Sequence, residues 1–230
     1  MKNKMGKSLT LAEETAQSII RYIIDNRMLP GDKLPTEPVF MEKLGVGRGT
    51  LREGIKLLAA RNIIDIRQGA GSFVSPKRGI PDDPLGLTFI YDDHELVLDM
   101  LDVRLTFEPH VAMLAATQAT AEERAEIAAQ AAEVERCIKE GVSYAKADSR
   151  FHRLIAEASG NRVFANLTYI LNSSIHKNIE LIEDRQWDSN IINYHRKIAA
   201  AIHAGKVNDA ACAMTMHLQT LREFVQEKMS

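Results

Sequence analysis

The sequence is poor in cysteine, with only Cys137 and Cys212 among its 230 residues. Two distant cysteines provide neither a disulfide framework nor a thiolate zinc cluster, so we expect reduced thiols in buried or half-buried positions. There is also no run of about 18 uncharged apolar residues, the length that marks a transmembrane helix. The first residues lead into a helical pattern rather than an apolar signal segment. These absences predict a soluble, cytoplasmic protein without a membrane partner.

Familiar catalytic motifs are missing as well. The sequence contains no glycine-rich phosphate loop, no nucleophile elbow and no H-E-x-x-H pair for zinc-dependent hydrolysis. Hydrophobic residues make up 45% of the chain and charged residues 26%, which is ordinary globular composition and excludes extended disorder. The sequence therefore favours a folded binding protein over an enzyme.

Charge is distributed unevenly along the chain. Residues 1–78 contain 14 Lys and Arg against 8 Asp and Glu, a net charge of +6, whereas the other 152 residues contain 15 against 23, a net charge of −8. The change coincides with the stretch SPKRGIPDDPLGLT, which is rich in proline and has no helical period. We predict a basic domain at 1–75 that faces a polyanion, a linker at 76–92 and a second domain at 93–230.

The basic domain shows three short helical patterns followed by a hairpin pattern. Apolar residues recur at helical spacing over 12–24, a second helix is expected after Thr36 as its N-cap, and a third begins near Gly47 or Arg48. The runs 63–66 and 72–74 flank the letters QGAG and predict two antiparallel strands. This order is the layout of a winged helix-turn-helix.

Beyond the linker the chain has almost only helical periodicity, which predicts an all-α bundle of six or seven helices. Thr120 and Glu123 form a capping box before a helix that ends near Gly141. Pro109 lies inside an otherwise helical stretch, so that helix is expected to be kinked or split there. The fold class is therefore mainly α, a winged helix-turn-helix followed by a helical bundle.

The third predicted helix carries a basic stripe, Arg48, Arg52 and Lys56, opposite its apolar face. The major groove accepts one α-helix, so Arg48 and Arg52 can reach guanine edges or phosphates. Thr50 and Lys56 can reach the DNA backbone. Considered alone, such a stripe also fits a solvated helix surface. Its position before a hairpin that contains Arg67 and glycines favours DNA binding.

Residues 30–74 resemble the DNA-binding domain of GntR-family transcription regulators. They contain the G-x-x-L-P-[ST]-E start, a recognition helix close to V-[ST]-R-x-x-[LV]-R-E, and a G-x-G wing. The resemblance implies that Arg48 and Arg52 read the operator. It also implies residues that cap the second helix near the phosphates and residues that shape the wing tip, namely Thr36, Glu37, Gly69 and Gly71.

Two residues depart from that family pattern. Gly47 replaces the usual Ser or Thr and removes a hydroxyl that would cap the helix or contact phosphate. Gly54 replaces an Ala, which is expected to weaken the recognition helix by roughly 1 kcal/mol. Affinity for DNA is therefore expected to be reduced, while the binding mode is kept.

Histidines suggest a second site, in the helical domain. His152 follows Asp148 by four residues, so both project from one helix face at a spacing that suits two ligands of one divalent cation. His195 and His217 lie on two later helices, and a bundle can bring such side chains together. Each histidine alone equally fits an ordinary core or surface position.

Residues 96–222 resemble the FCD ligand-binding domain of the FadR subgroup. The matching segments are VRLTFEPHVAMLAA, ADSRFHRLIAEASGN and YHRKIAAAIHAGKVNDAACAMTMHL. The resemblance implies a divalent transition metal held by Asp148, His152, His195 and His217, and it disfavours the acyl-CoA-binding branch. Three imidazoles and one carboxylate suit zinc, which we favour, and also nickel, manganese or iron(II).

A metal with open coordination positions would accept a small hydroxy- or keto-carboxylate as effector. Arg104 is expected to pair with the carboxylate of that acid, although it is also spaced for an ordinary helix ion pair with Glu108. Trp187 is expected to form a wall of the effector pocket, or else to belong to the core. His176 is a spare ligand candidate.

These expectations combine into a transcription regulator of the repressor type that binds a pseudo-palindromic operator as a homodimer, because one winged helix has too small a footprint on DNA. A sugar acid or another hydroxy acid would change its affinity for DNA. Two alternatives share the metal ligands. One is a regulator for which the metal ion itself is the signal, and the other is a metal-dependent hydrolase.

Overall fold

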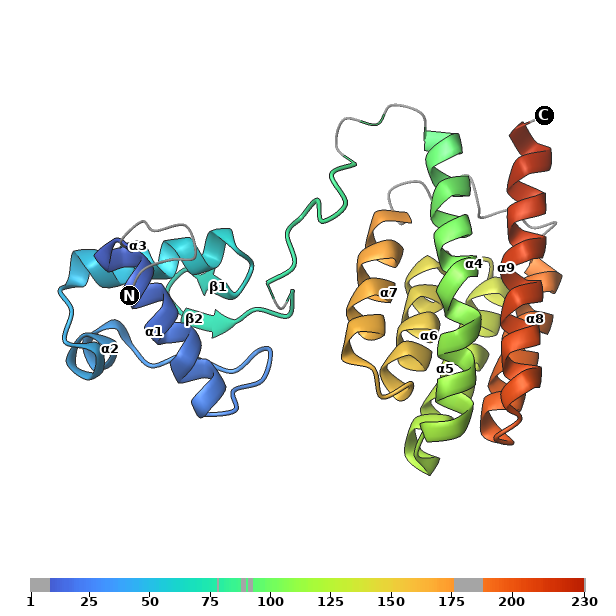
Figure 1. The fold of residues 1–230 in the computed structure, drawn as a ribbon, viewed down its shortest axis with the longest axis horizontal. Coiled ribbons are helices and arrows are strands. Elements are labelled where there is room, and N and C mark those ends of the chain that lie inside the picture. The colour runs from blue at the N-terminus through green and yellow to red at the C-terminus, as the bar shows by residue number, and fades with distance from the viewer. Residues whose placement is uncertain (1–8, 78, 88–89, 91–92, 176–187, 230) are drawn as a thin grey trace. The chain divides into compact units, whose positions relative to one another are not determined.

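The computed structural model describes residues 9–77, 79–87, 90, 93–175 and 188–229. The chain divides into two compact units, Met1–Pro84 and Leu85–Ser230. The division falls between residues 76 and 92, and the domain bounds given above stay a prediction. None of the helices in the described ranges is long and apolar enough to cross a membrane. The fold class expected from the sequence is confirmed, three helices and a hairpin followed by a helical bundle (Figure 1).

The N-terminal unit consists of α1 (Leu11–Asp25), α2 (Glu37–Leu44), α3 (Arg48–Ala60), β1 (Ile64–Arg67) and β2 (Gly71–Val74). Thr10 is the N-cap of α1 and forms a capping box with Glu13. This T-x-x-E signal is visible in the sequence but was not part of the prediction, which rested on apolar periodicity. Apolar residues from the three helices and the hairpin enclose one small core, which includes Ile19, Phe40 and Leu51.

Gly54 lies where α3 packs against α1. A Cβ atom at this position would lie 3.1 Å from Thr15 Cγ2 and 3.3 Å from both Ala12 O and Ala16 N. The glycine therefore permits the close approach of two helix backbones. Its cost in helix propensity, expected from the sequence, is offset by packing with α1.

The two strands form an antiparallel hairpin in which Ile64 pairs with Val74 and Arg67 with Gly71. The tip turns through Gly69, at φ 73°, and Gly71, at φ 110°, which are left-handed conformations that favour glycine. The segment before α2 runs along β2, because Leu34 N donates to Ser72 O at 2.9 Å. The hairpin is thus anchored to the segment that leads into α2.

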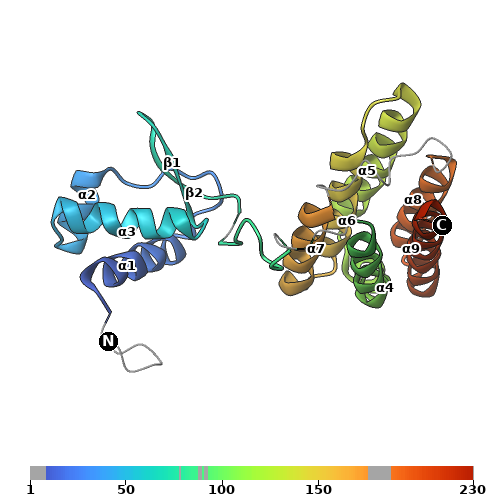
Figure 2. The same ribbon diagram turned by 90° about the horizontal axis from the view of Figure 1, so that it is seen from above.

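The C-terminal unit contains six helices in its described residues, which are α4 (Asp93–Gln118), α5 (Ala121–Glu140), α6 (Ala145–Ala158), α7 (Arg162–Ile175), α8 (Asp188–His203) and α9 (Val207–Met229). Helix α4 runs alongside α9, with α6 and α7 on its other side (Figures 1 and 2). Helix α4 continues through Pro109, so the split expected as one possibility there does not occur. The capping box of Thr120 and Glu123 and the end of α5 at Gly141 are confirmed.

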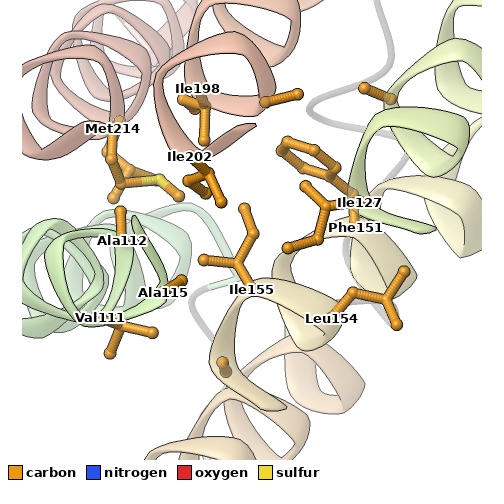
Figure 3. Close-up of a cluster of buried hydrophobic side chains, with 14 of the residues drawn as sticks. Val111, Ala112, Ala115, Ile127, Phe151, Leu154, Ile155, Ile198, Ile202 and Met214 are labelled. Atoms are coloured by element: carbon orange, nitrogen blue, oxygen red, sulfur yellow. The ribbon is translucent and has the colours of Figure 1, made fainter. Parts of the chain in front are cut away.

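The core of this unit is built from the facing sides of α4, α5, α6, α8 and α9. Figure 3 shows Ile155 of α6 pointing towards Ile202 of α8, with Ala112 of α4 and Met214 of α9 beside them. Cys137 is buried, as expected. Cys212 on α9 is exposed, so the expectation of a buried or half-buried thiol is wrong there.

Arg124 joins the ends of two helices in this bundle. Its guanidinium donates to Ala116 O and Ala119 O at the end of α4, and to Ile202 O and His203 O at the end of α8, at 2.7 to 3.0 Å. These carbonyls lie in the last turns, where no helical N–H is available. One side chain therefore fixes α4 and α8 against each other.

Candidate functional site

The basic stripe expected for DNA binding lies on one exposed side of α3. Arg48, Arg52 and Lys56 are all exposed, whereas Thr50 is half-buried. Lys56 Nζ lies 3.0 Å from Glu53 Oε1, an exposed pair within the same helix. Arg52 Nε lies 3.0 Å and 3.1 Å from the two carboxylate oxygens of Glu37. The stripe therefore faces solvent, and Arg52 is steadied by the start of α2.

Thr36 takes the N-cap position of α2, with an extended backbone, but its hydroxyl makes no capping hydrogen bond. The expected hydroxyl cap is therefore wrong. The second residue of the helix, Pro38, has no N–H to donate. Glu37 lies in the first turn as expected, where its charge is favourable to the helix dipole and where it also receives Arg52.

Two cations lie beside one aromatic ring of the hairpin, one from the hairpin itself and one from the segment before α2. The guanidinium carbon of Arg67 lies 4.1 Å from the centre of the Phe73 ring, and Lys33 Nζ lies 5.9 Å from the same centre. Arg67, Gly69 and Gly71 were expected in this hairpin, but Lys33 was not. Its approach depends on the segment before α2 returning to β2, a contact between distant residues that periodicity does not reveal.

Asp148, His152, His195 and His217 meet inside the helical bundle. Each offers a ligand atom, and these atoms all lie within 4.8 Å of one another. We call these four residues the histidine cluster. The three histidines are at most 2% exposed, whereas Asp148 is half-buried. The structure therefore brings together the four metal-ligand candidates that the sequence suggested.

Helical spacing explains why these histidines lie inside the bundle. His152 precedes the core residue Ile155 by three positions, and His195 precedes Ile198 by three. His217 follows Met214 by three. Residues three or four apart share one helix face, so each histidine continues an apolar stripe. The histidine cluster is thus a polar layer within the core.

Aromatic contacts fix the imidazole rings. The Phe151 ring stacks on His195 at a centroid distance of 4.4 Å, and the rings of His152 and His217 are stacked at 5.3 Å. The ring of His217 lies 4.8 Å from that of His195. The rings therefore have little freedom to rotate apart.

Two carboxylates flank His152 on opposite sides. His152 Nδ1 lies 2.7 Å from Glu108 Oε2, and His152 Nε2 lies 3.9 Å from Asp148 Oδ1. Asp148 Oδ1 also lies 3.3 Å from His195 Nε2. Glu108 is 2% exposed and receives Arg104 Nε at 2.6 Å on its other oxygen. Arg104 therefore contacts Glu108, and Glu108 contacts His152, so two buried charged side chains adjoin the histidine cluster at His152.

The pKa values of the buried groups follow from this arrangement. Burial lowers the pKa of both His195 and His217 well below 6.5, and the neighbouring histidines lower it further. Burial alone would raise the pKa of Glu108, but Arg104 and His152 outweigh it and lower that pKa. At neutral pH the imidazoles of His195 and His217 are thus neutral and ready to donate lone pairs.

The residues present fit a divalent transition metal. The buried ring nitrogens that make no hydrogen bond within the described part of the chain are both those of His152, both those of His195 and Nδ1 of His217. Buried polar atoms without partners are costly, and a metal would satisfy them. Three imidazoles with one carboxylate form a donor set that suits zinc, nickel, manganese or iron(II).

Arg104 is 4% exposed, and its ion pair with Glu108 is the alternative that its spacing allowed. Its expected contact with an effector stays a prediction. Trp187 and His176 lie outside the described residues, so the structure does not bear on the roles expected for them.

Comparisons with known proteins assign both units. Residues 11–74 match the model of bacterial regulatory proteins of the gntR family, and residues 99–220 match the FCD domain. The chain is 30% identical to the Glc operon transcriptional activator of Escherichia coli K12, over 93% of this chain and 88% of that protein. It is 29% identical to the putative L-lactate dehydrogenase operon regulatory protein of the same strain, over 95% and 89%.

A solved structure supports the same assignment. The Streptococcus agalactiae GntR structure is similar with a TM-score of 0.82 at 33% identity, covering 92% of this chain and 99% of that one. These matches identify a DNA-binding transcription regulator and not an enzyme, so the hydrolase alternative is wrong. The chain belongs to the GntR family of bacterial regulatory proteins, in the FadR subgroup that carries an FCD domain.

Proposed function

We propose that the protein is a repressor that binds a pseudo-palindromic operator as a homodimer and responds to a small carboxylate at a metal site in its helical unit. The observation that carries this proposal is the buried histidine cluster, whose ligand atoms lie within 4.8 Å of one another in a chain that also has a GntR unit. The cluster gives the regulator a place at which to sense a ligand.

Operator recognition is assigned to α3 and the hairpin. Arg48 and Arg52 contact guanine edges or phosphates, and Thr50 and Lys56 contact the DNA backbone. Exposure of the three basic side chains on α3 supports this role. Arg67 and the glycines of the hairpin tip approach the adjacent DNA, while Thr36 and Glu37 lie at the start of α2. A dimer doubles the footprint of one winged helix.

The metal is assigned to Asp148, His152, His195 and His217, with zinc favoured over nickel, manganese or iron. When bound, the ion would offer open coordination positions to the oxygen atoms of a hydroxy acid. The chain itself supplies the neutral imidazoles of His195 and His217. It also excludes bulk water around all three histidines, because they are buried. Arg104 and Trp187 are the residues we assign to the effector.

A hydroxy acid or a sugar acid is the effector class that we favour. One relative is named for the Glc operon and another for an L-lactate dehydrogenase operon, and lactate is a hydroxy acid. An acid that binds one conformation of the regulator better changes its affinity for the operator by a coupling of about 1–3 kcal/mol.

Fluorescence anisotropy tests this proposal with the metal-loaded full chain on DNA from the region upstream of its own gene. The protein is titrated at two salt concentrations, with and without a panel of small hydroxy- and keto-carboxylates. Nanomolar binding that is tighter than binding to unrelated DNA, and from which one acid releases the protein, would support the proposal. Tighter binding to this DNA in the presence of the acid would instead make the protein an activator or a regulator of the co-repressor type.

Equal binding to any DNA, collapsing with salt, would leave only attraction between charges and overturn operator recognition. If affinity follows the free metal concentration and no acid has an effect, the metal ion itself is the signal.

A further inference from the structure

Glu108 is a buried acid that the DNA-binding role does not use. Its carboxylate is 2% exposed inside the bundle, between Arg104 on its own helix and His152 on α6. Oε1 receives Arg104 Nε at 2.6 Å, and Oε2 lies 2.7 Å from His152 Nδ1. A buried charge is expensive unless it is paired, so a simple packing role would be better filled by an apolar residue.

The position of Glu108 decides which nitrogen of His152 carries the proton. A neutral imidazole has one N–H donor and one lone pair. The 2.7 Å contact between His152 Nδ1 and Glu108 Oε2 is a close approach without the alignment of an ideal hydrogen bond. A carboxylate held beside a guanidinium can only accept, so at this distance Nδ1 of His152 is the nitrogen that carries the proton. The lone pair then lies on Nε2, the nitrogen that faces Asp148 in the histidine cluster. This is the tautomer that a metal requires on that side.

We propose that Glu108 is a positioning residue for the metal site, which fixes His152 in the Nδ1–H tautomer and aims Nε2 into the histidine cluster. Outer carboxylates of this kind orient metal-binding histidines and raise their basicity. The inference rests on the proposed function, because it needs a metal at the histidine cluster. It adds a fifth residue to that site, one that does not touch the ion.

Arg104 acts through Glu108 in this arrangement. Its Nε and Nη2 are both directed at the Glu108 carboxylate, at 2.6 Å and 3.4 Å. The guanidinium holds Oε1 closely and reaches Oε2 only at 3.4 Å. A carboxylate oxygen has more than one lone pair, so Oε2 can still accept from His152. Arg104 therefore holds the Glu108 carboxylate in place, and Glu108 in turn orients the metal ligand His152. This role does not depend on any contact between Arg104 and an effector.

The amide variant Glu108→Gln tests this directly. Arg104 attracts the amide oxygen, which turns the amide NH2 towards His152 Nδ1 and favours the wrong tautomer. We expect zinc affinity of the metal-free full chain, measured by competition with a chromophoric chelator, to fall about 10–100-fold. Long-range ¹H–¹⁵N NMR of the metal-free protein should show that His152 moves from Nδ1–H towards Nε2–H. Asp102→Asn, on an exposed residue of the same helix, should change neither.

A matched pair of variants covers the case in which Glu108→Gln leaves Arg104 unpaired and does not fold. Arg104→Met/Glu108→Gln and Arg104→Met/Glu108→Met both remove the buried charges, and only the first keeps an acceptor for His152 Nδ1. Replacing both members of a buried pair is tolerated better than removing one. The glutamine variant should bind zinc about 10-fold or more tightly than the methionine variant and retain the Nδ1–H tautomer.

Equal zinc affinity and the same His152 tautomer in that pair would overturn the inference while leaving the metal site intact. A wild-type chain that binds no zinc, nickel, manganese or iron would instead overturn the proposed metal site, and the positioning role with it. The two failures are distinguishable because the first is seen only in the variants and the second already in the wild type.

Discussion

The histidine cluster occupies positions where a helical bundle would otherwise place aliphatic residues. His152, His195 and His217 are at most 2% exposed and lie in line with isoleucine, leucine and methionine on their helices. Such a layer costs stability unless its nitrogens find partners. At the scale of single residues, the cluster is therefore best explained by the metal that we propose it binds.

Replacing one member of the histidine cluster should remove the metal. His195→Ala deletes a buried ligand, so zinc affinity should fall by more than the about 10–100-fold that loss of an outer partner costs. The measurement is elemental analysis of the purified chain together with chelator competition. His203→Ala is the control, because His203 is an exposed residue on the same helix. A fully loaded His195→Ala chain would refute the ligand assignment.

Acid should destabilise the metal-free helical unit. The pKa of His195 and His217 is lowered well below 6.5 by burial and neighbouring histidines, while the unfolded chain takes up protons near pH 6.5. Below that pH the unfolded state binds more protons, so the free energy of unfolding should fall by roughly 1.4 kcal/mol per pH unit for each histidine that stays neutral in the fold.

Urea unfolding of the metal-free chain between pH 7.5 and about 5, a range above the titration of ordinary carboxylates, checks this. The variant His195→Leu/His217→Leu should lose most of the pH dependence. An identical pH dependence in wild type and variant would show that other groups are responsible.

Arg52 is expected to carry base recognition. Arg52→Ala should weaken operator binding by about 1–3 kcal/mol and relax specificity at one position. Lys56→Ala should instead weaken binding to all sequences and reduce the salt dependence by about one phosphate contact. Anisotropy with operator variants at two salt concentrations separates the two. The exposed Arg52–Glu37 pair contributes little to folding, so stability should change by less than about 1 kcal/mol.

At the scale of elements, local signals in the sequence predicted most of the architecture. Apolar periodicity located α1 and α3, and a capping box located the start of α5. The hairpin was predicted within a residue at each end, because two glycines at the tip demand a turn. Contacts between elements were not accessible in this way. Lys33 meets Phe73, and Glu108 meets His152, only after distant segments have packed.

The candidate site was predictable only in part for the same reason. The spacing of Asp148 and His152 is visible on one helix. The convergence of His195 and His217 depends on how α8 and α9 pack, so helical periodicity offered it only as a possibility and the family resemblance singled it out. The prediction that the Thr36 hydroxyl caps α2 is wrong, because a residue at the N-cap position does not always form the side-chain hydrogen bond.

Gly54 gives a test of the packing between α1 and α3. Gly54→Ala gains about 1 kcal/mol of helix propensity but places a Cβ atom 3.1 Å from Thr15 Cγ2 and 3.3 Å from α1 backbone atoms. Overpacking typically costs about 1–3 kcal/mol, so the N-terminal unit should lose about 1 kcal/mol. Gly49→Ala, on the same helix with no atom within 4 Å, should stabilise it by up to about 1 kcal/mol.

Hydrogen exchange of α1 and α3 in dilute urea measures both changes in the full chain. A stabilising Gly54→Ala of the same size as Gly49→Ala would mean that α1 moves away at no cost, and that the close approach of the two helices is not needed.

At the scale of the whole molecule, a basic DNA-binding unit and an acidic helical unit are joined in one chain. The first carries a net charge of +6 over residues 1–78 and the rest −8. This separation keeps polyanion binding in one unit and ligand binding in the other. Under the proposed function, regulation requires that occupancy of the histidine cluster change the affinity of the proposed dimer for its operator.

The most direct measurement of that link is operator affinity with and without the releasing acid, compared between the zinc-loaded wild type and His195→Ala. The account predicts that the acid changes the operator affinity of the wild type by about 5–150-fold and leaves that of His195→Ala unchanged, with His203→Ala behaving as wild type. An equal response to the acid in wild type and His195→Ala would contradict the account, because sensing would then not pass through the histidine cluster.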